Sequence, residues 1–452
     1  MDPTRPAGGT RRRVAIVGVV TGVLVGAVTG AALFTGAAPP GTGPRPLVLH
    51  AAPAVVAVAG AAELTAATFC ETPEAPTCAV ERATGYVRPA GAAGWTPLEG
   101  VFLEGAYRFT VPPELIPDDG FSYRFEFRTA GGGVVAYPPG GETSAIRVVT
   151  TAGLPVREVP AFDWEPRRAD GTVVAMPYGD DDGEVGRTTG TDEEVVVGPS
   201  SFDVAADGSV MVADWVHGRI QEFTASGEFR RSLALPTDQP VDIASAQGGG
   251  LALTTLGSAA TAFELDARGL VLGRYPIGFG IASRVAAAHG GPRVLVGSGQ
   301  WTPVRSTPGA PLDPGAQGRL QSATVPLPDG KVAVSADVAE GAFAVVWTRP
   351  DGSRAGATVQ LPPGVAGGTD YFVRPLDDGG AVVAKGLWDE THFAVGVLRF
   401  DATGEVVTFD LLPEPSAEQA ARYSTVRFRA PGEVLIALAD DRGVHIDRFD
   451  VR

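Results

Sequence analysis

Short runs in which hydrophobic and polar residues alternate recur along this chain, and long apolar stripes with a helical period are absent. The clearest run covers residues 121–127, where Phe121, Tyr123, Phe125 and Phe127 alternate with polar residues. A period of two is typical of a β-strand with one buried face. The 60 Gly and 38 Pro residues interrupt many short Val-rich runs, as turns do. The pattern predicts an all-β chain.

Residues 199–234 contain four such runs separated by turn residues. A strand with Phe202 and Val204 meets an Asp207-Gly208 turn, and an apolar run follows at 210–213. A third strand is expected at 219–223, and a fourth after Ser226-Gly227. Four short antiparallel strands joined by turns are typical of one β-propeller blade.

The segment also carries a recognisable motif. The turn Asp207-Gly208, the pair Ala213-Asp214 and the triplet Arg219-Ile220-Gln221 occur in this order. This order resembles the NHL repeat, and the resemblance implies a propeller.

The turn between the first two strands recurs at intervals of 39 to 53 residues, close to the length of one blade. The recurring turn positions are Asp207-Gly208, Gly248-Gly249, Gly290-Gly291, Asp329-Gly330, Asp378-Gly379 and Pro431-Gly432. Six turns predict six blades within residues 160–452. The third blade is the least regular, because prolines fill the place of its outer hairpin.

The last repeat ends with a third strand at residues 444–451, which leaves no room for a fourth. A closed ring therefore needs an outer strand from upstream, and two runs are available, 193–197 and 171–175. Either one would remove an exposed sheet edge.

Residues 47–151 form a separate unit of short alternating runs, at 54–58, 79–88, 105–111, 121–129 and 144–150. The aromatic strand late in this unit resembles the penultimate strand of immunoglobulin-like and fibronectin type III sandwiches. The fibronectin version fits better, because the cysteine spacing of true immunoglobulins is missing. We expect a spacer or a docking partner for the next domain rather than a ligand-binding module.

The N-terminal region predicts export. Residues 1–13 form a basic stub with Arg11, Arg12 and Arg13, and residues 14–38 are uncharged and apolar. This length suits a transmembrane anchor with the stub in the cytoplasm, and a cleavable signal segment is the alternative. A Pro/Gly linker follows at 39–46. We expect a single-pass membrane protein of a high-GC bacterium with most of its chain outside the cytoplasm, or a secreted one after cleavage.

Cys70 and Cys78 are the two cysteines of the chain, and a turn-rich loop separates them. In an oxidising compartment such a pair is expected to form a disulfide. A redox or metal pair would need a tighter spacing and further ligands.

The net charge of −16 opposes binding to nucleic acid. The acidic, glycine-rich stretch 178–187 suggests either a solvated turn or a calcium loop, although it lacks the ligand spacing of an EF-hand. We expect the solvated turn, and no other cofactor.

Candidate binding residues gather where second strands are expected to end, because these ends open on one face of a propeller. Aligned with these ends are Asp214, Asp337, Lys385 and Asp440. The loops that follow carry the aromatic and histidine residues Trp215, His217, Trp301, Trp388 and His392. Aromatic residues on one rim are typical of a surface that binds protein or glycan, although they also wedge between blades.

Catalysis is the weaker interpretation. Some NHL-type propellers are zinc-dependent lyases and related ones are calcium-dependent lactonases, but the chain has only five His and no Asn. We therefore expect a non-catalytic recognition protein at the cell surface. The alternatives are a hydrolase or lyase with a metal in the channel, and a structural protein of the cell envelope.

Overall fold

The structure is a computed structural model, and its described residues all belong to the compact unit Gly43–Arg452. The described residues are 47–50, 55–56, 61–69, 79–103, 105–138, 141–188, 198–239, 241–246, 249–255, 260–276, 282–286, 293–296, 300–303, 324–326, 332–351, 353–415, 425–429 and 432–451. They form strands, turns and the short 3-10 helices η2 (Pro113–Leu115), η3 (Gly141–Ser144) and η4 (Trp215–His217). The prediction of an all-β chain is confirmed.

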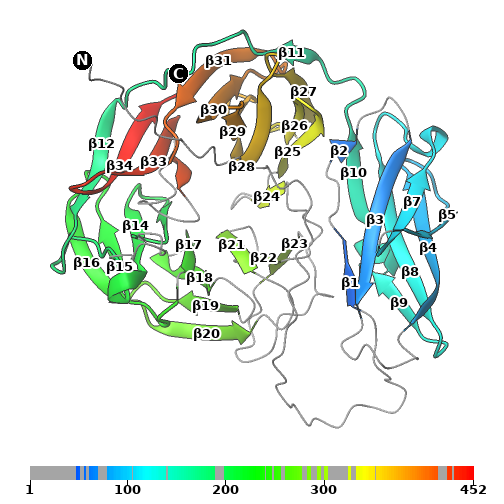
Figure 1. The fold of residues 1–452 in the computed structure, drawn as a ribbon, viewed down its shortest axis with the longest axis horizontal. Helices are drawn as coiled ribbons and strands as arrows, with labels where there is room; N and C mark the ends of the chain where they lie inside the picture. The colour runs from blue at the N-terminus through cyan, green and yellow to red at the C-terminus, as the bar shows by residue number, and fades with distance from the viewer. Residues whose placement is uncertain are drawn as a thin grey trace, which may run out of the picture. The chain divides into compact units, whose positions relative to one another are not determined.

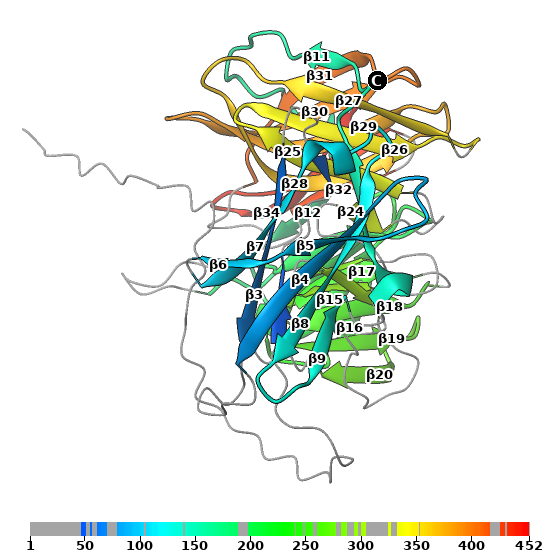
Figure 2. The same ribbon diagram turned by 90° about the vertical axis from the view of Figure 1, so that its right-hand side faces the viewer.

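The described residues from 47 to 150 form two sheets around one core. The first sheet has the order β1 (Leu47–Leu49), β3 (Ala62–Phe69), β7 (Ala106–Val111), β6 (Val101–Leu103). The second has the order β2 (Val55–Val56), β10 (Ile146–Thr150), β8 (Phe121–Thr129), β4 (Val80–Pro89), β5 (Thr96–Glu99), with β9 (Val134–Tyr137) also on β8. Figure 2 shows the long strands β3, β4 and β8 of this part of the chain.

The aromatic face predicted for β8 is confirmed. Phe121, Tyr123, Phe125 and Phe127 are all at most 1% exposed and lie in the shared core. His50 joins them: its Nδ1 contacts the carbonyl oxygen of Thr65 and its Nε2 contacts the Tyr123 hydroxyl. A neutral imidazole satisfies both contacts by donating from Nδ1 and accepting at Nε2. Burial accordingly lowers the pKa of His50 to about 4.

The described residues after 155 form antiparallel sheets built from consecutive strands. Four of these sheets contain only strands that are consecutive in the chain. The first has β13 (Ser201–Val204), β14 (Val210–Asp214), β15 (Arg219–Phe223) and β16 (Phe229–Ala234), and the second has β17 (Val241–Ser245), β18 (Leu251–Thr255), β19 (Thr261–Leu265) and β20 (Val271–Pro276). The third has β21 (Ala282–Ala286), β22 (Arg293–Val296) and β23 (Gln300–Pro303), and the fourth has β28 (Ala366–Pro375), β29 (Ala381–Trp388), β30 (Phe393–Phe400) and β31 (Val406–Leu412).

Two further sheets recruit a strand from upstream. One has β24 (Thr324–Pro326), β25 (Val332–Ala339), β26 (Ala342–Thr348) and β27 (Arg354–Gln360), with β11 (Val156–Glu158) parallel to β27. The other has β32 (Val426–Arg429), β33 (Glu433–Ala439), β34 (Gly443–Asp450) and, antiparallel to β34, β12 (Gly171–Pro177). In Figure 1 the first strands β17, β21, β24 and β28 lie nearest the centre, and the outer strands β16, β20 and β31 lie at the periphery. This arrangement is a β-propeller.

The strand that completes the last sheet is one of the two predicted from the sequence. Residues 171–177 pair with β34 from Gly171 opposite Arg448 to Pro177 opposite Gly443. The competing run, 193–197, lies outside the described residues. A strand from the start of the propeller therefore closes its last sheet, which leaves β34 without an open edge.

Side chains of the inner strands join one sheet to the next. Arg427 on β32 binds Asp203 on β13, with 2.9 Å between Nε and Oδ1. Asp242 on β17 accepts the backbone N–H of Val285 on β21 at 2.8 Å. Arg284 on β21 instead donates to the carbonyl oxygen of Tyr371 on β28 at 3.0 Å, and the β24–β27 sheet comes between these two sheets in the chain. Buried charges that find such partners hold the sheets in fixed positions.

No described helix is long and apolar enough to cross a membrane. The predicted anchor at 14–38, the flanking segments 1–13 and 39–46, and Cys70 and Cys78 lie outside the described residues. Those expectations stay predictions.

A substitution at Gly227 tests whether β12 packs against the turn between β15 and β16. Gly227 has φ +86°, and a Cβ there would lie 1.7 Å from the carbonyl oxygen of Val173 on β12. Gly364 has φ +82° with open space around it. We expect Gly364→Ala to cost about 1 kcal/mol of backbone strain, and Gly227→Ala to cost about 1–3 kcal/mol more through the clash. Thermal unfolding of both variants measures the difference, and equal losses would contradict packing of β12 against this turn.

Lowering the pH should destabilise the two sheets formed by the described residues from 47 to 150, because His50 is buried there. The pKa of His50 is about 4 when folded, against 6.5 for an ordinary histidine, so the unfolded chain binds the extra proton between these pH values. The free energy of unfolding from this group therefore falls as the pH drops from 6.5 to 4, by about 3 kcal/mol in total. Urea unfolding at both ends of this range should show a smaller loss for His50→Gln. An equal loss would show that His50 is not the group responsible.

Candidate functional site

A groove of about 1060 Å³ lies where two neighbouring sheets of the propeller meet. Its walls come from the end of β11, the β25–β26 connection, the β27–β28 connection and the end of β29. The β25–β26 connection joins second and third strands, and so does the β29–β30 connection. Because strand direction alternates within each sheet, such connections share one face with those between sheets. This is the face on which the sequence predicted binding residues.

Trp388 forms an exposed wall of this groove. It is the last residue of β29, pairs with Phe393 across the hairpin, and is 38% exposed. A Cβ at Gly368 would lie 3.5 Å from two atoms of the indole ring, which is an ordinary van der Waals distance, so the ring lies beside the backbone of β28. The groove floor includes Leu361 and Val365, which belong to the buried core of these sheets. The groove therefore combines an exposed indole with a packed apolar floor.

Carboxylates surround the indole. Glu158, Glu340, Asp389 and Glu390 line the groove. The backbone N–H of Thr391 donates to the Asp389 carboxylate at 2.7 Å, and His392 adds further hydrogen bonds. These bonds lower the pKa of Asp389 to about 2. The groove therefore stays negatively charged at neutral pH.

Lys385 lies beside the groove in the interior of β29. Its ammonium group has no exposed surface and lies 2.9 Å from Asp370 Oδ1 and 3.0 Å from Asp337 Oδ1. It also donates to the carbonyl oxygen of Gly368 at 3.1 Å. Burial opposes the charge, but the two carboxylates outweigh it and raise the pKa of Lys385. Lys385 therefore forms structural ion pairs, and its buried ammonium group is not accessible to a ligand.

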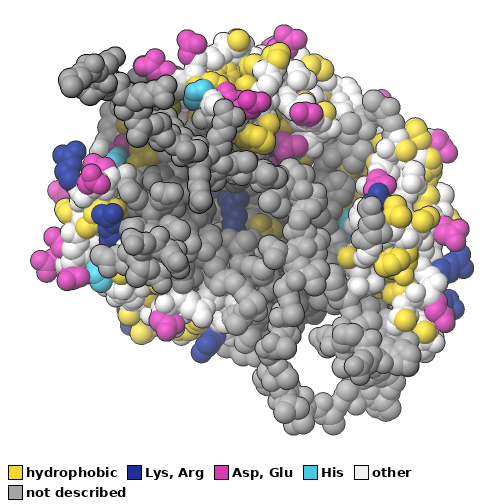
Figure 3. Space-filling model, viewed as in Figure 1, with side chains coloured by type: hydrophobic (Ala, Val, Ile, Leu, Met, Phe, Trp, Pro, Cys, Tyr) yellow, Lys and Arg dark blue, Asp and Glu magenta, His cyan; other side chains and the backbone are white. Residues whose placement is uncertain are grey.

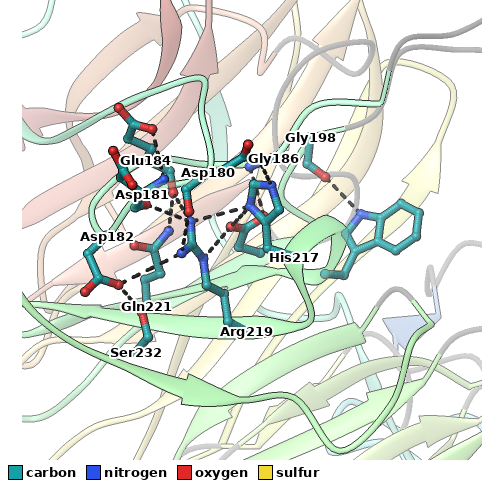
Figure 4. Close-up of polar contacts among 12 residues, drawn as sticks. Asp180, Asp181, Asp182, Glu184, Gly186, Gly198, His217, Arg219, Gln221 and Ser232 are labelled. Carbon is teal, nitrogen blue, oxygen red and sulfur yellow. Dashed lines mark hydrogen bonds and ion pairs between the residues drawn. The ribbon is translucent and has the colours of Figure 1, made fainter.

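A second cluster surrounds Asp214 at the end of β14 (Figure 4). The buried carboxylate accepts hydrogen bonds from the backbone N–H of Gly186 at 3.1 Å, from His217 Nδ1 at 2.9 Å and from Arg219 Nε at 2.9 Å. The other ring nitrogen of His217 lies 2.9 Å from Asp180 Oδ1.

This cluster binds the acidic stretch 178–187 to the sheet formed by β13, β14, β15 and β16, which is the first complete sheet of the propeller. Arg219 donates to the carbonyl oxygens of Asp181 and Glu184, at 2.9 and 2.8 Å. Gln221 donates to Glu184 and accepts from the N–H of Gly183. The Asp214, Arg219 and Gln221 side chains of the repeat motif thus bind this stretch, with only parts of it solvated as predicted. Within the described residues, no group of three or more His, Cys, Asp or Glu is placed to hold a metal ion.

The other predicted residues take separate places. Trp215 donates from its indole to the carbonyl oxygen of Gly198 at 2.9 Å, and His392 stacks on Trp164 with 5.4 Å between ring centroids. Asp440 closes a turn by accepting the backbone N–H of Arg442 at 2.8 Å. Trp301 lies in β23, opposite Leu295. Its side chain lies outside the described residues.

Four placements differ from the sequence prediction, which put Asp337 and Lys385 at strand ends and Trp301 and Trp388 in loops. β25 continues to Ala339 and β29 to Trp388, so Asp337 and Lys385 lie inside strands. Lys385 is tolerated there because Asp370 is its cross-strand partner. The connection before Trp301 is short, since β22 ends at Val296 and β23 begins at Gln300. Trp388 also ends a strand rather than lying in a loop.

The groove brings Trp388 together with residues that sequence reasoning missed, namely Glu158, Glu340 and Glu390. Glu340 follows a second strand directly, which is a signal that could have found it. Glu158 belongs to the upstream strand β11, whose pairing with β27 no local pattern indicates.

The comparison with protein-family models gave no match, and the comparison with curated proteins gave none either. Among solved structures, the chain is similar to a protein of unknown function from Bacteroides thetaiotaomicron, with 11% identity, 91% of this chain and 99% of that one covered, and a TM-score of 0.38. It is also similar to BamB from Moraxella catarrhalis, with 15% identity, 56% and 88% covered, and a TM-score of 0.29. A streptogramin B lyase matches with 14% identity, 56% and 84% covered, and a TM-score of 0.30.

The Lys385 cluster yields a stability prediction. Lys385→Met leaves Asp337 and Asp370 close together without their cation, so we expect a loss of about 3 kcal/mol or more. Asp337→Asn removes only an exposed partner and should cost under about 1 kcal/mol. Chemical unfolding of the two variants measures this. Similar costs for both would contradict the assignment of Lys385 as the buried centre of the cluster.

Proposed function

We propose that this chain is an extracytoplasmic recognition protein, anchored by residues 14–38, that binds a protein or a glycan without transforming it. In this proposal the propeller has six NHL-like blades, and a fibronectin-like sandwich precedes it. The six sheets found among the described residues after 155 support the first part, and the two sheets around one core support the second. The apolar segment next to Arg11–13 supports the location.

The exposed indole of Trp388 in the groove carries the proposal. Tryptophan is the residue type most often found at the energetic centre of an interface, because it buries a large apolar area when a partner covers it. Here the backbone of Trp388 is held by the β29–β30 hairpin, and its ring lies beside the backbone at Gly368. Little conformational entropy is lost on binding to such a ring.

The electrostatics of the groove agree with binding. A general acid at neutral pH needs a carboxyl group with a raised pKa, whereas the pKa of Asp389 is about 2. Glu158 is the last residue of β11, and Glu390 lies in the β29–β30 connection. These carboxylates are suited to hold a partner by charge.

Replacing the indole tests this function. We expect the full chain to bind members of a peptide and glycan array, and Trp388→Ala to weaken that binding about 30-fold or more. Phe102→Ala is the matched control, because Phe102 is also an exposed aromatic residue, on β6. Unchanged binding by Trp388→Ala, or no binding by the native chain, would overturn the proposal.

A further inference from the structure

The groove presents hydrogen-bond acceptors but almost no side-chain donors. Its described lining includes four carboxylates, of Glu158, Glu340, Asp389 and Glu390, and no Lys, Arg, His, Ser or Thr. The side-chain donors of this lining are the indole N–H of Trp388 and the amide of Gln360, and one N–H of that amide already donates to the carbonyl oxygen of Gly341 at 3.1 Å. A ligand of this groove must therefore supply most of the donors itself.

Three of the four groove carboxylates have no cationic partner among the described residues. Among the described residues, Glu158, Glu340 and Glu390 form no ion pair, whereas the nearby Asp337 is paired with Lys385. In Figure 3, Asp and Glu side chains appear around the periphery, with Lys and Arg side chains among them. The formal net charge of the whole chain is −16. The field at the groove therefore attracts cations and repels anions.

An apolar surface lies next to these charges. Leu361 and Val365 form the floor, Pro362 and Pro363 lie beside them, and Trp388 stands at the edge. Lys and Arg side chains combine an apolar stem with a cationic head, so they suit such a surface. A cationic head is also attracted to the face of an indole ring.

We propose that the groove binds a basic peptide segment of a partner protein, with Arg or Lys residues flanked by apolar ones. This rests on the proposed recognition function and names its ligand class. A neutral glycan fits less well, because its hydroxyl groups need donors as well as acceptors. The volume of about 1060 Å³ accommodates several side chains of an extended peptide.

The test uses the full chain and two short labelled peptides of equal length. In one, Arg and Lys alternate with Leu and Pro; in the other, citrulline and acetyl-lysine replace the basic residues. We expect the basic peptide to bind at least tenfold more tightly, with an affinity that falls as salt is raised. Equal affinity for both peptides would overturn the inference.

The variant Glu158→Gln/Glu340→Gln/Glu390→Gln removes three of the four groove charges with little change of shape and leaves Asp389. We expect it to bind the basic peptide roughly tenfold more weakly, since exposed ion pairs contribute modestly each. The control Glu81→Gln/Glu99→Gln/Glu114→Gln removes the same charge from exposed positions on β4, β5 and η2. It should bind within about twofold of the native chain. Equal losses in both variants would show that net charge, not the groove, attracts the peptide.

The two proposals fail separately. Binding of glycans or neutral peptides that depends on Trp388 without any preference for basic residues would overturn this inference and leave the recognition function standing. Absence of any ligand whose binding depends on Trp388 would overturn both. Thermal unfolding of each variant confirms that a loss of binding is not a loss of fold.

Discussion

The backbone pairing between β12 and β34 is the constraint on which the propeller depends. The last sheet has only three strands of its own at the C-terminal end, and residues 171–177 supply the fourth. Without this strand, β34 would be an open edge. The pairing joins the start of the propeller to its last sheet, although more than 260 residues separate the two strands in the sequence.

Charges inside the propeller and charges on its groove have different roles. Arg219, Arg427 and Lys385 are each held by carboxylates or carbonyl oxygens of other elements, and so join segments of the chain. Glu340 and Glu390 have no such cation within the described residues. The repeat motif of the first complete sheet thus serves assembly, and the residues open to a partner lie outside the motif.

Much of the fold could be predicted from local patterns. The alternation in β8 and the recurring glycine turns identified strands and their sheets, because both reflect local backbone geometry. The site was harder. A charged residue is unusual in a strand interior, so the sequence pattern placed Lys385 at a strand end. Its partner Asp370 lies on the neighbouring strand, and only the pairing of the two strands brings them together. Glu158 reaches the groove through the parallel pairing of β11 with β27, which depends on the complete fold.

The closing strand is fastened at both of its ends, and this affects how the ring can open. Before β12, the guanidinium of Arg167 donates to the carbonyl oxygen of Asp450 at 2.9 Å. The backbone N–H of Asp170 donates to the carbonyl oxygen of Arg448 at 2.8 Å. After β12, the acidic stretch is bound by Arg219 and Gln221. Fraying at either end must therefore break side-chain attachments in addition to the pairing of β12 with β34. Release of the closing strand, to a protease or under a pulling force, is thereby made a rarer event.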